Sequence, residues 1–99
     1  MSFGPLHFDP TTHQLLYGEK ELSLTCTEGH ILYQLMMNAG HVVTHSSLAE
    51  AVWGDDYGGG TDSLKVYIRR LREKIELDPS HPQYILTKTG VGYLLTKPS

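Results

Sequence analysis

The stretch from Asp62 to Glu76 constrains this chain more than any other, because it combines a helical repeat with an excess of basic side chains. Its apolar residues recur at i, i+4, i+7 and i+11, the spacing of one helical face: Leu64, Ile68, Leu71 and Ile75. Two faces remain, and they carry five basic side chains: Lys65, Arg69, Arg70, Arg72 and Lys74. The stretch therefore predicts a long amphipathic helix with one face for a core and two faces for other uses.

One of the two polar faces has no acid among the side chains that would point at a partner: Ser63, Val66, Tyr67 and Arg70. A helix that lies in the major groove of DNA presents a face of this kind to the bases. A solvated surface helix with charges for solubility is the alternative for an arbitrary chain, because charge runs are usually solvated. The rest of the sequence has to decide between the two.

The formal net charge of −3 argues against nucleic acid only until its distribution is considered. Residues 1–62 hold one base against eight acids, a net charge of −7, whereas residues 63–99 hold seven bases against three acids, a net charge of +4. DNA phosphates respond to the local field within about 10 Å at moderate salt rather than to the total charge. The C-terminal third therefore has the basic character of a DNA-binding surface.

Composition bounds the class of protein. The 99 residues, 39% hydrophobic and 19% charged, suffice for one globular domain with one core. No apolar run reaches membrane-spanning length, and no signal-peptide pattern opens the chain. The single cysteine, Cys26, cannot form an internal disulfide, so we expect a reduced, cytoplasmic setting without a membrane partner.

The first 40 residues predict a small sheet followed by a helix. Residues 6–8, 15–17 and 21–24 have the pattern of short antiparallel strands separated by turns. Thr25 and Glu28 fit a capping box at the start of a helix, and Gly40 suits the left-handed position just after its end.

The remaining elements complete a recognisable order. Thr44 can cap a second helix over about 45–53, residues 41–43 form an extended link, and the long helix follows an acidic, glycine-rich loop. Residues 84–88 and 93–96 predict strands of a hairpin with its tip at 89–92. Sheet, three helices and a hairpin predict an α+β winged helix-turn-helix. We expect a single domain over 1–99, with the sheet in 1–25 and the helices and wing in 26–99.

Nothing in the sequence predicts catalysis or a cofactor. No nucleophile is paired with a base, and the glycine-rich loops lack the ending of a nucleotide-binding loop. His41 and His45 are four apart but lie in different elements, and the other histidines are scattered along the chain: His7, His13, His30 and His81. We therefore expect ordinary histidines, no metal site and a structural role for Cys26.

Three further features are open to two readings. Trp53 could pack in the core or offer its indole N–H to a phosphate. Tyr67 is expected to contact bases or backbone, because Leu64, Ile68 and Leu71 already fill the core stripe. The acidic residues of the loop are either a plain linker or a surface for a partner protein.

Four segments resemble the signature segments of one family: 24–28 (LTCTE), 51–54 (AVWG), 66–76 (VYIRRLREKIE) and 89–93 (TGVGY). The family is the OmpR/PhoB-type effector domain, the C-terminal DNA-binding domain of bacterial two-component response regulators. The resemblance implies a four-stranded N-terminal sheet, three helices and a hairpin wing. It also implies sequence-specific binding of double-stranded DNA as a dimer on tandem sites. The wing looks closer to the KdpE-like branch, which regulates potassium transport.

The resemblance also implies roles for residues. Major-groove contacts fall on Ser63, Val66, Tyr67 and Arg70. Backbone contacts fall on His45, Trp53, Arg72 and Thr87, to which the basic faces add Lys65, Arg69 and Lys74. The wing would meet the minor groove through Lys88, Thr89 and Gly90. With the basic face and Lys88, we expect about 4–6 neutralised phosphates per monomer.

Partners follow from the same resemblance. The loop with Asp55, Asp56 and Tyr57 would touch RNA polymerase, and a receiver domain, absent from these residues, would precede this one and link it to a sensor histidine kinase. The sequence departs from the family at Thr89, where arginine is frequent, at Gly29, where a bulky apolar residue is usual, and at Asp62. A winged helix used for protein–protein contact is the alternative, favoured by the net charge of −3.

Overall fold

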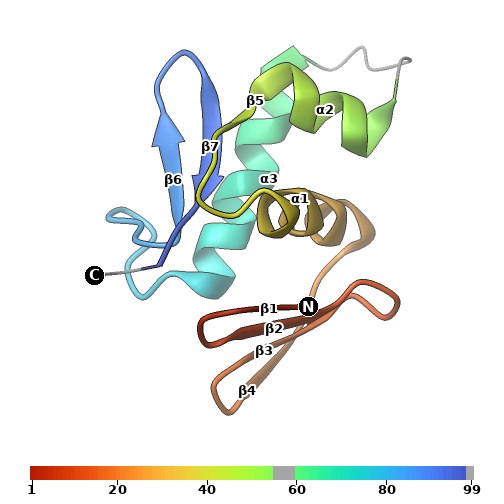
Figure 1. Cartoon of the computed structure of the whole chain (residues 1–99), viewed down its shortest axis with the longest axis vertical. Helices are drawn as coiled ribbons and strands as arrows, with labels where there is room; N and C mark the ends of the chain where they lie inside the picture. The colour runs from red at the N-terminus through yellow and green to blue at the C-terminus, as the bar shows by residue number, and fades with distance from the viewer. Residues whose placement is uncertain (55–59, 98–99) are drawn as a thin grey trace.

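The computed structural model describes the backbone of residues 1–54 and 60–97 and the side chains of residues 1–54 and 63–97. A sheet lies at one end of the molecule, the second of the three helices lies farthest from it, and a hairpin stands beside the helices (Figure 1). The elements are, in order, β1 (Ser2–Phe3), β2 (Leu6–Asp9), β3 (Gln14–Tyr17), β4 (Lys20–Ser23), α1 (Cys26–Met37), β5 (Val43–Thr44), α2 (His45–Trp53), α3 (Gly60–Ile75), β6 (Ile85–Lys88) and β7 (Gly92–Leu95). This order confirms the predicted winged helix-turn-helix.

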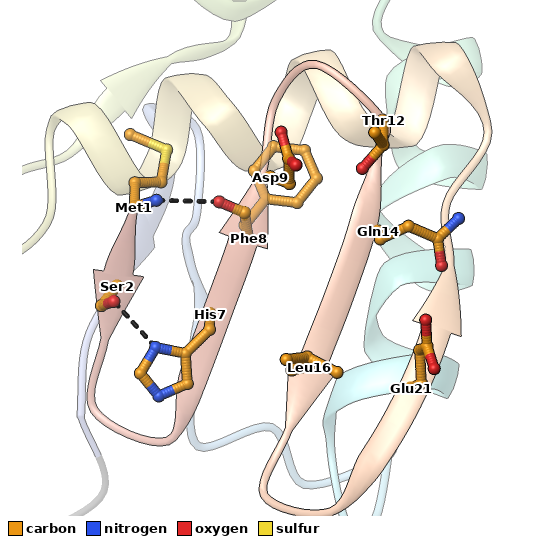
Figure 2. Close-up of a pocket in the computed structure, with 9 residues that line it drawn as sticks. All are labelled: Met1, Ser2, His7, Phe8, Asp9, Thr12, Gln14, Leu16 and Glu21. Atoms are coloured by element: carbon orange, nitrogen blue, oxygen red, sulfur yellow. Dashed lines mark hydrogen bonds between the residues drawn. The ribbon is translucent and has the colours of Figure 1, made fainter.

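The N-terminal sheet is antiparallel, with the order β1-β2-β3-β4. Because side chains alternate along a strand, Leu6, Phe8 and Leu15 lie on the inner face and are at most 2% exposed. The outward face surrounds a shallow hollow of about 400 Å³ with mainly polar side chains, among them His7 and Glu21 (Figure 2). Strand β1 has only two residues, too few for a pattern, so only the family resemblance implied it.

The three helices bury the faces that their periodicity predicts. All four apolar residues of the α3 stripe are at most 3% exposed: Leu64, Ile68, Leu71 and Ile75. They join Ile31, Leu32 and Leu35 of α1 and Leu48 of α2 in one core. The predicted capping box is present, since Thr25 Oγ1 accepts from the Glu28 N–H at 3.2 Å and Glu28 Oε1 accepts from the Thr25 N–H at 2.9 Å.

The hairpin belongs to a second sheet, which the sequence did not predict. The expected link at 41–43 instead leads into β5, which pairs with β7 in a three-stranded sheet of order β5-β7-β6. A Cβ at Gly92 would collide with the carbonyl oxygen of Val43, so glycine is needed there for the close approach of β5. Gly90, at the tip, has a φ of +77°, the left-handed region that favours glycine.

Within the part of the chain that the structure describes, every helix is too short or too polar to span a lipid bilayer.

Candidate nucleic-acid interface

The N-terminal half of α3 lies at the end of the molecule opposite the N-terminal sheet (Figure 1). Several of its side chains are exposed. Lys65, Arg69 and Arg70 are exposed, and Val66 is 49% exposed although it is apolar. Ser63 is half-buried at the edge of this surface. We call Ser63, Lys65, Val66, Arg69 and Arg70 the α3 outer face. No acidic residue belongs to it, which makes it suitable for a polyanion.

A stack of side chains supports the position of Arg70. Its guanidinium carbon lies 5.4 Å from the centre of the Tyr67 ring, and the Tyr67 and Trp53 rings are 5.9 Å apart and inclined by 49°. Tyr67 and Trp53 are both half-buried and pack against the core. Arg70 therefore rests on an aromatic platform built from α2 and α3, a cation–π arrangement that limits its rotamers.

This platform bears on two residues whose roles were predicted from the sequence. Tyr67 is half-buried and packs on Trp53 at the end of α2, while its expected contact with bases or backbone stays a prediction. Trp53 packs against the core, as one of its two readings predicted, and its contact with phosphate stays a prediction.

Arg72 is occupied inside the molecule. Its Nε and Nη2 donate to the carbonyl oxygen of Ile85 at 3.0 and 2.9 Å, and Nη2 donates to Thr87 Oγ1 at 2.6 Å. The guanidinium also lies 5.8 Å from the centre of the Tyr93 ring. Burial lowers the pKa of Arg72 from its usual value. The side chain thus fastens α3 to the hairpin, a structural role that the expected contact of Arg72 with DNA phosphates did not include.

Lys74 is occupied as well, on the side that faces the N-terminal sheet. Its Nζ lies 2.6 Å from Glu28 Oε1 and 3.2 Å from the carbonyl oxygen of Ser23. Glu28 is only 2% exposed. Burial acts to raise the pKa of Glu28, but the hydrogen bonds from Lys74 and from the Thr25 N–H outweigh it, so the pKa lies below the ordinary value. The charge of Lys74 thus compensates a buried carboxylate, a structural role that the expected DNA contact did not include.

Glu76, the residue that follows α3, is a buried acid. The residue is 7% exposed, and its carboxylate accepts from the backbone N–H groups of Gln83, Tyr84 and Ile85 at 2.8–3.1 Å. These donors belong to the segment that leads into β6. Glu76 therefore fixes the end of α3 to the start of the hairpin.

The wing and the start of α2 lie side by side. The His45 N–H donates to the carbonyl oxygen of Val91 at 3.1 Å, and its ring meets the Tyr93 ring edge-on with centres 5.2 Å apart. The tip residues Lys88, Thr89 and Gly90 are exposed. We call these three residues the wing tip. Asp55, Asp56 and Tyr57, expected to contact polymerase, lie outside the described residues.

The exposed basic side chains differ in whether they are paired with an acidic one. Within the described residues, Lys65, Arg70 and Lys88 form no salt bridge. Arg69 lies 3.4 Å from Glu73 in a pair that is exposed on both sides, and such pairs contribute little. Of the cations that were predicted to contact DNA, those available to a partner are thus on the α3 outer face and the wing tip.

One cluster of potential ligands was not foreseen from the sequence. Of the histidines that are scattered along the chain, His13 and His30 come together with Cys26, and the ligand atoms of the three residues lie within 4.8 Å of one another. The turn after β2 brings His13 onto α1, and spacing along the sequence could not show this long-range contact. A weaker signal was available, because Cys26 and His30 are four apart on one helix.

A long helix with a free basic face, held between two other helices and a β-hairpin, defines a winged-helix DNA-binding domain. Comparison with known proteins gives the family. Residues 19–95 match the family model described as "Transcriptional regulatory protein, C terminal". The chain belongs to this family and is an effector domain of the OmpR/PhoB type, the DNA-binding and transcription-regulating part of two-component response regulators.

Comparisons with individual proteins agree with this family assignment. The chain is 41% identical over 92 residues to the sensory transduction protein RegX3 of Mycobacterium leprae. The aligned residues make up 93% of this chain and 46% of that protein. It is 38% identical to the response regulator DrrB of Thermotoga maritima, with a TM-score of 0.85 over 97% of this chain and 43% of that one. It is 31% identical to the RstA DNA-binding domain of Klebsiella pneumoniae, solved in complex with the RstA box, with a TM-score of 0.86 over 97% and 95%. The chain thus spans about half the length of its curated relative.

Proposed function

We propose that this domain binds double-stranded DNA sequence-specifically by placing the α3 outer face in the major groove. The observation that carries the proposal is the α3 outer face, which contains no acidic residue, with Arg70 held over Tyr67. A positioned arginine can donate two hydrogen bonds to the O6 and N7 atoms of guanine. Val66 is suited to the methyl group of thymine, and Ser63 and Tyr67 to polar atoms nearby.

Backbone contacts would surround this base-reading surface. Lys65 and Arg69 flank it on α3, and His45, Trp53 and Thr87 lie on the neighbouring elements and are suited to phosphate oxygens. The wing tip would approach the minor groove, where Lys88 adds one cation. Arg72 and Lys74 are not part of the interface that we propose, because their charges are bound inside the molecule.

The wider context is also a proposal. Because the chain spans 46% of RegX3, we propose that a receiver domain precedes it in the natural protein and is controlled by a sensor histidine kinase. Two copies would bind tandem sites, and Asp55, Asp56 and Tyr57 would contact RNA polymerase. We further propose that the domain binds chromosomal DNA in the cytoplasm and has no catalytic role. The KdpE-like branch stays a prediction.

Titration with salt tests the DNA proposal. A site is selected from random duplexes, and its affinity is measured by fluorescence anisotropy between low and moderate salt. Three free cations and the exposed Arg69 neutralise about 3–4 phosphates per monomer, so log K should fall against log salt with a slope of about −3 to −3.5. This slope is shallower than the 4–6 phosphates expected from the sequence would give. A flat response, or no selectable duplex, would favour a winged helix that binds protein.

A further inference from the structure

We propose that His13, Cys26 and His30 form a binding site for a borderline-soft divalent transition-metal ion such as Zn²⁺. One thiolate and two imidazoles are the ligand types that Zn²⁺ prefers in proteins. The three ligand atoms lie within 4.8 Å of one another, and no part of the DNA-binding proposal uses them.

The two ligands on α1 are already near the required separation. Cys26 Sγ and His30 Nε2 are 3.8 Å apart. Zinc–sulfur and zinc–nitrogen bonds at a tetrahedral angle place such a pair about 3.6 Å apart. Both residues are exposed, so small rotations of their side chains can close the difference. The Cys-x3-His spacing on one helix therefore supplies half of a tetrahedral site.

The third ligand is held in place by its backbone. His13 has a φ of 60°, the left-handed region, and it is the one described residue other than glycine with a positive φ. This conformation costs energy for a side chain with a Cβ, and it persists where the surroundings fix it. Here the His13 N–H donates to the Asp9 carbonyl oxygen at 2.8 Å, and the His13 carbonyl oxygen accepts from the Leu24 N–H at 3.0 Å. The turn thus holds the imidazole against α1.

Gly29 makes room for that imidazole. A Cβ at position 29 would lie 2.8 Å from Cδ2 of the His13 ring, closer than real Cβ contacts allow. The ring is also parallel to Phe8, with an interplanar angle of 7°, and edge-on to His30 with centres 5.8 Å apart. The glycine that costs helix stability in the first turns of α1 is therefore the residue that lets His13 approach Cys26 and His30.

A bound ion would connect two parts of the fold. His13 belongs to the turn between β2 and β3, whereas Cys26 and His30 belong to α1. Three protein ligands leave one coordination position open to water or to a ligand from a partner. The site lies beside the N-terminal sheet, away from the α3 outer face, so metal binding should stabilise the domain without entering the DNA interface.

Metal titration of the untagged, reduced domain tests the site. Zn²⁺ is added in competition with a chromophoric chelator, and Co²⁺ is added separately to detect the charge-transfer absorption of a thiolate–cobalt bond. We expect one ion per domain, a thiolate–cobalt band, and a Tm that rises with Zn²⁺ but not with Mg²⁺. Cys26→Ser and His30→Ala, both at exposed positions, should each weaken Zn²⁺ binding by at least about 10–100-fold.

Two further variants separate a built site from adventitious binding. His41→Ala removes an exposed histidine outside the cluster and should leave Zn²⁺ affinity unchanged. Gly29→Ala keeps all three ligands but displaces the His13 ring, so it should weaken Zn²⁺ binding while circular dichroism still reports a folded domain. Zn²⁺ affinity that is the same in wild type, Cys26→Ser and His30→Ala, or a Co²⁺ spectrum without a thiolate band, would overturn the proposal.

Discussion

Residues 63–70 of α3 and residues 71–75 of its C-terminal half both carry basic side chains but differ in where those charges are directed. Lys65 and Arg70 form no salt bridge within the described residues and point away from the core. Arg72 and Lys74 instead donate to Ile85 and Thr87 and to Glu28 and Ser23. One half is available to DNA, and the other assembles the domain that presents it.

The difference teaches that charge counted along a helix includes side chains that already make hydrogen bonds within the fold. The sequence marks five basic residues on the two polar faces, but two of them hold the hairpin and the N-terminal sheet in place. Because the C-terminal half fixes the orientation of α3 relative to the wing, it affects DNA binding through geometry rather than through charge. Variants in the two halves should therefore separate stability from affinity.

The largest effect is expected from Glu76→Ala. The substitution leaves the N–H groups of Gln83, Tyr84 and Ile85 without their acceptor, in surroundings where the carboxylate is 7% exposed. We expect a loss of about 3–5 kcal/mol in the free energy of unfolding, measured by urea denaturation. Glu73→Ala is the matched control on the same helix, and it should stay within about 0.5 kcal/mol because Glu73 is exposed. Similar losses for both would contradict the division of α3.

Arg70→Ala and Arg72→Ala should have opposite signatures. Arg70→Ala should cost about 1–3 kcal/mol of binding to the selected site, relax the preference for one base and leave stability unchanged. Arg72→Ala should lower the free energy of unfolding by about 1–2 kcal/mol, because the Ile85 carbonyl and Thr87 lose a charged donor.

The pair is measured by anisotropy and urea denaturation at one temperature. The contrary outcome is an Arg72→Ala variant that keeps its stability but loses affinity for specific and non-specific duplexes alike. If that loss is as large as the loss of Arg70→Ala on the specific duplex, the guanidinium of Arg72 leaves the hairpin to bind phosphate.

Lys74→Met should reduce stability by about 1–2 kcal/mol, because it leaves the buried Glu28 carboxylate without its cation. The effect should be smaller than for a fully buried pair, since Lys74 is 32% exposed. Lys65→Met should leave stability unchanged and reduce the magnitude of the salt slope by about 0.9. A Lys74→Met variant that keeps full stability would show that the ion pair contributes nothing.

The same pair predicts a pH dependence. The pKa of Glu28 lies below its ordinary value in the folded state, so the stabilisation is present above the unfolded pKa and is lost as pH falls through the folded pKa. The free energy of unfolding should therefore fall as the pH drops below about 4.5. Urea denaturation of Lys74→Met over the same range should show a shallower fall, and parallel curves would mean that another group is responsible.

The smallest effect is expected at the wing tip. Thr89→Arg adds a free cation to an exposed position, so it should increase affinity by about 1 kcal/mol and steepen the salt slope by about 0.9. Arginine favours a narrow, A-tract minor groove, so the gain should be larger on sites with that flank. An equal gain on all flanks would indicate contact with phosphate only, and no gain would mean that the wing does not reach DNA.

Much of this fold follows from local pattern. The α3 stripe, the capping box at Thr25 and the glycine turn at Gly90 depend on residues close in sequence, so periodicity and capping chemistry predict them. The family segments then implied β1, which two residues could not reveal. Strand β5 was missed because its two residues are a strand only by pairing with β7.

What the sequence by itself determined is the helical register of α3, and hence which of its residues are buried and which are basic and outward. Tertiary structure alone decided which cations remain free, because the partners of Arg72 and Lys74 come from β6 and α1, distant in the chain. It also decided that Tyr67 rests on Trp53, and that His13 reaches Cys26 and His30. Spacing along one element predicts a face, but the atoms that meet that face are supplied by other elements, and only their packing settles what each side chain contacts.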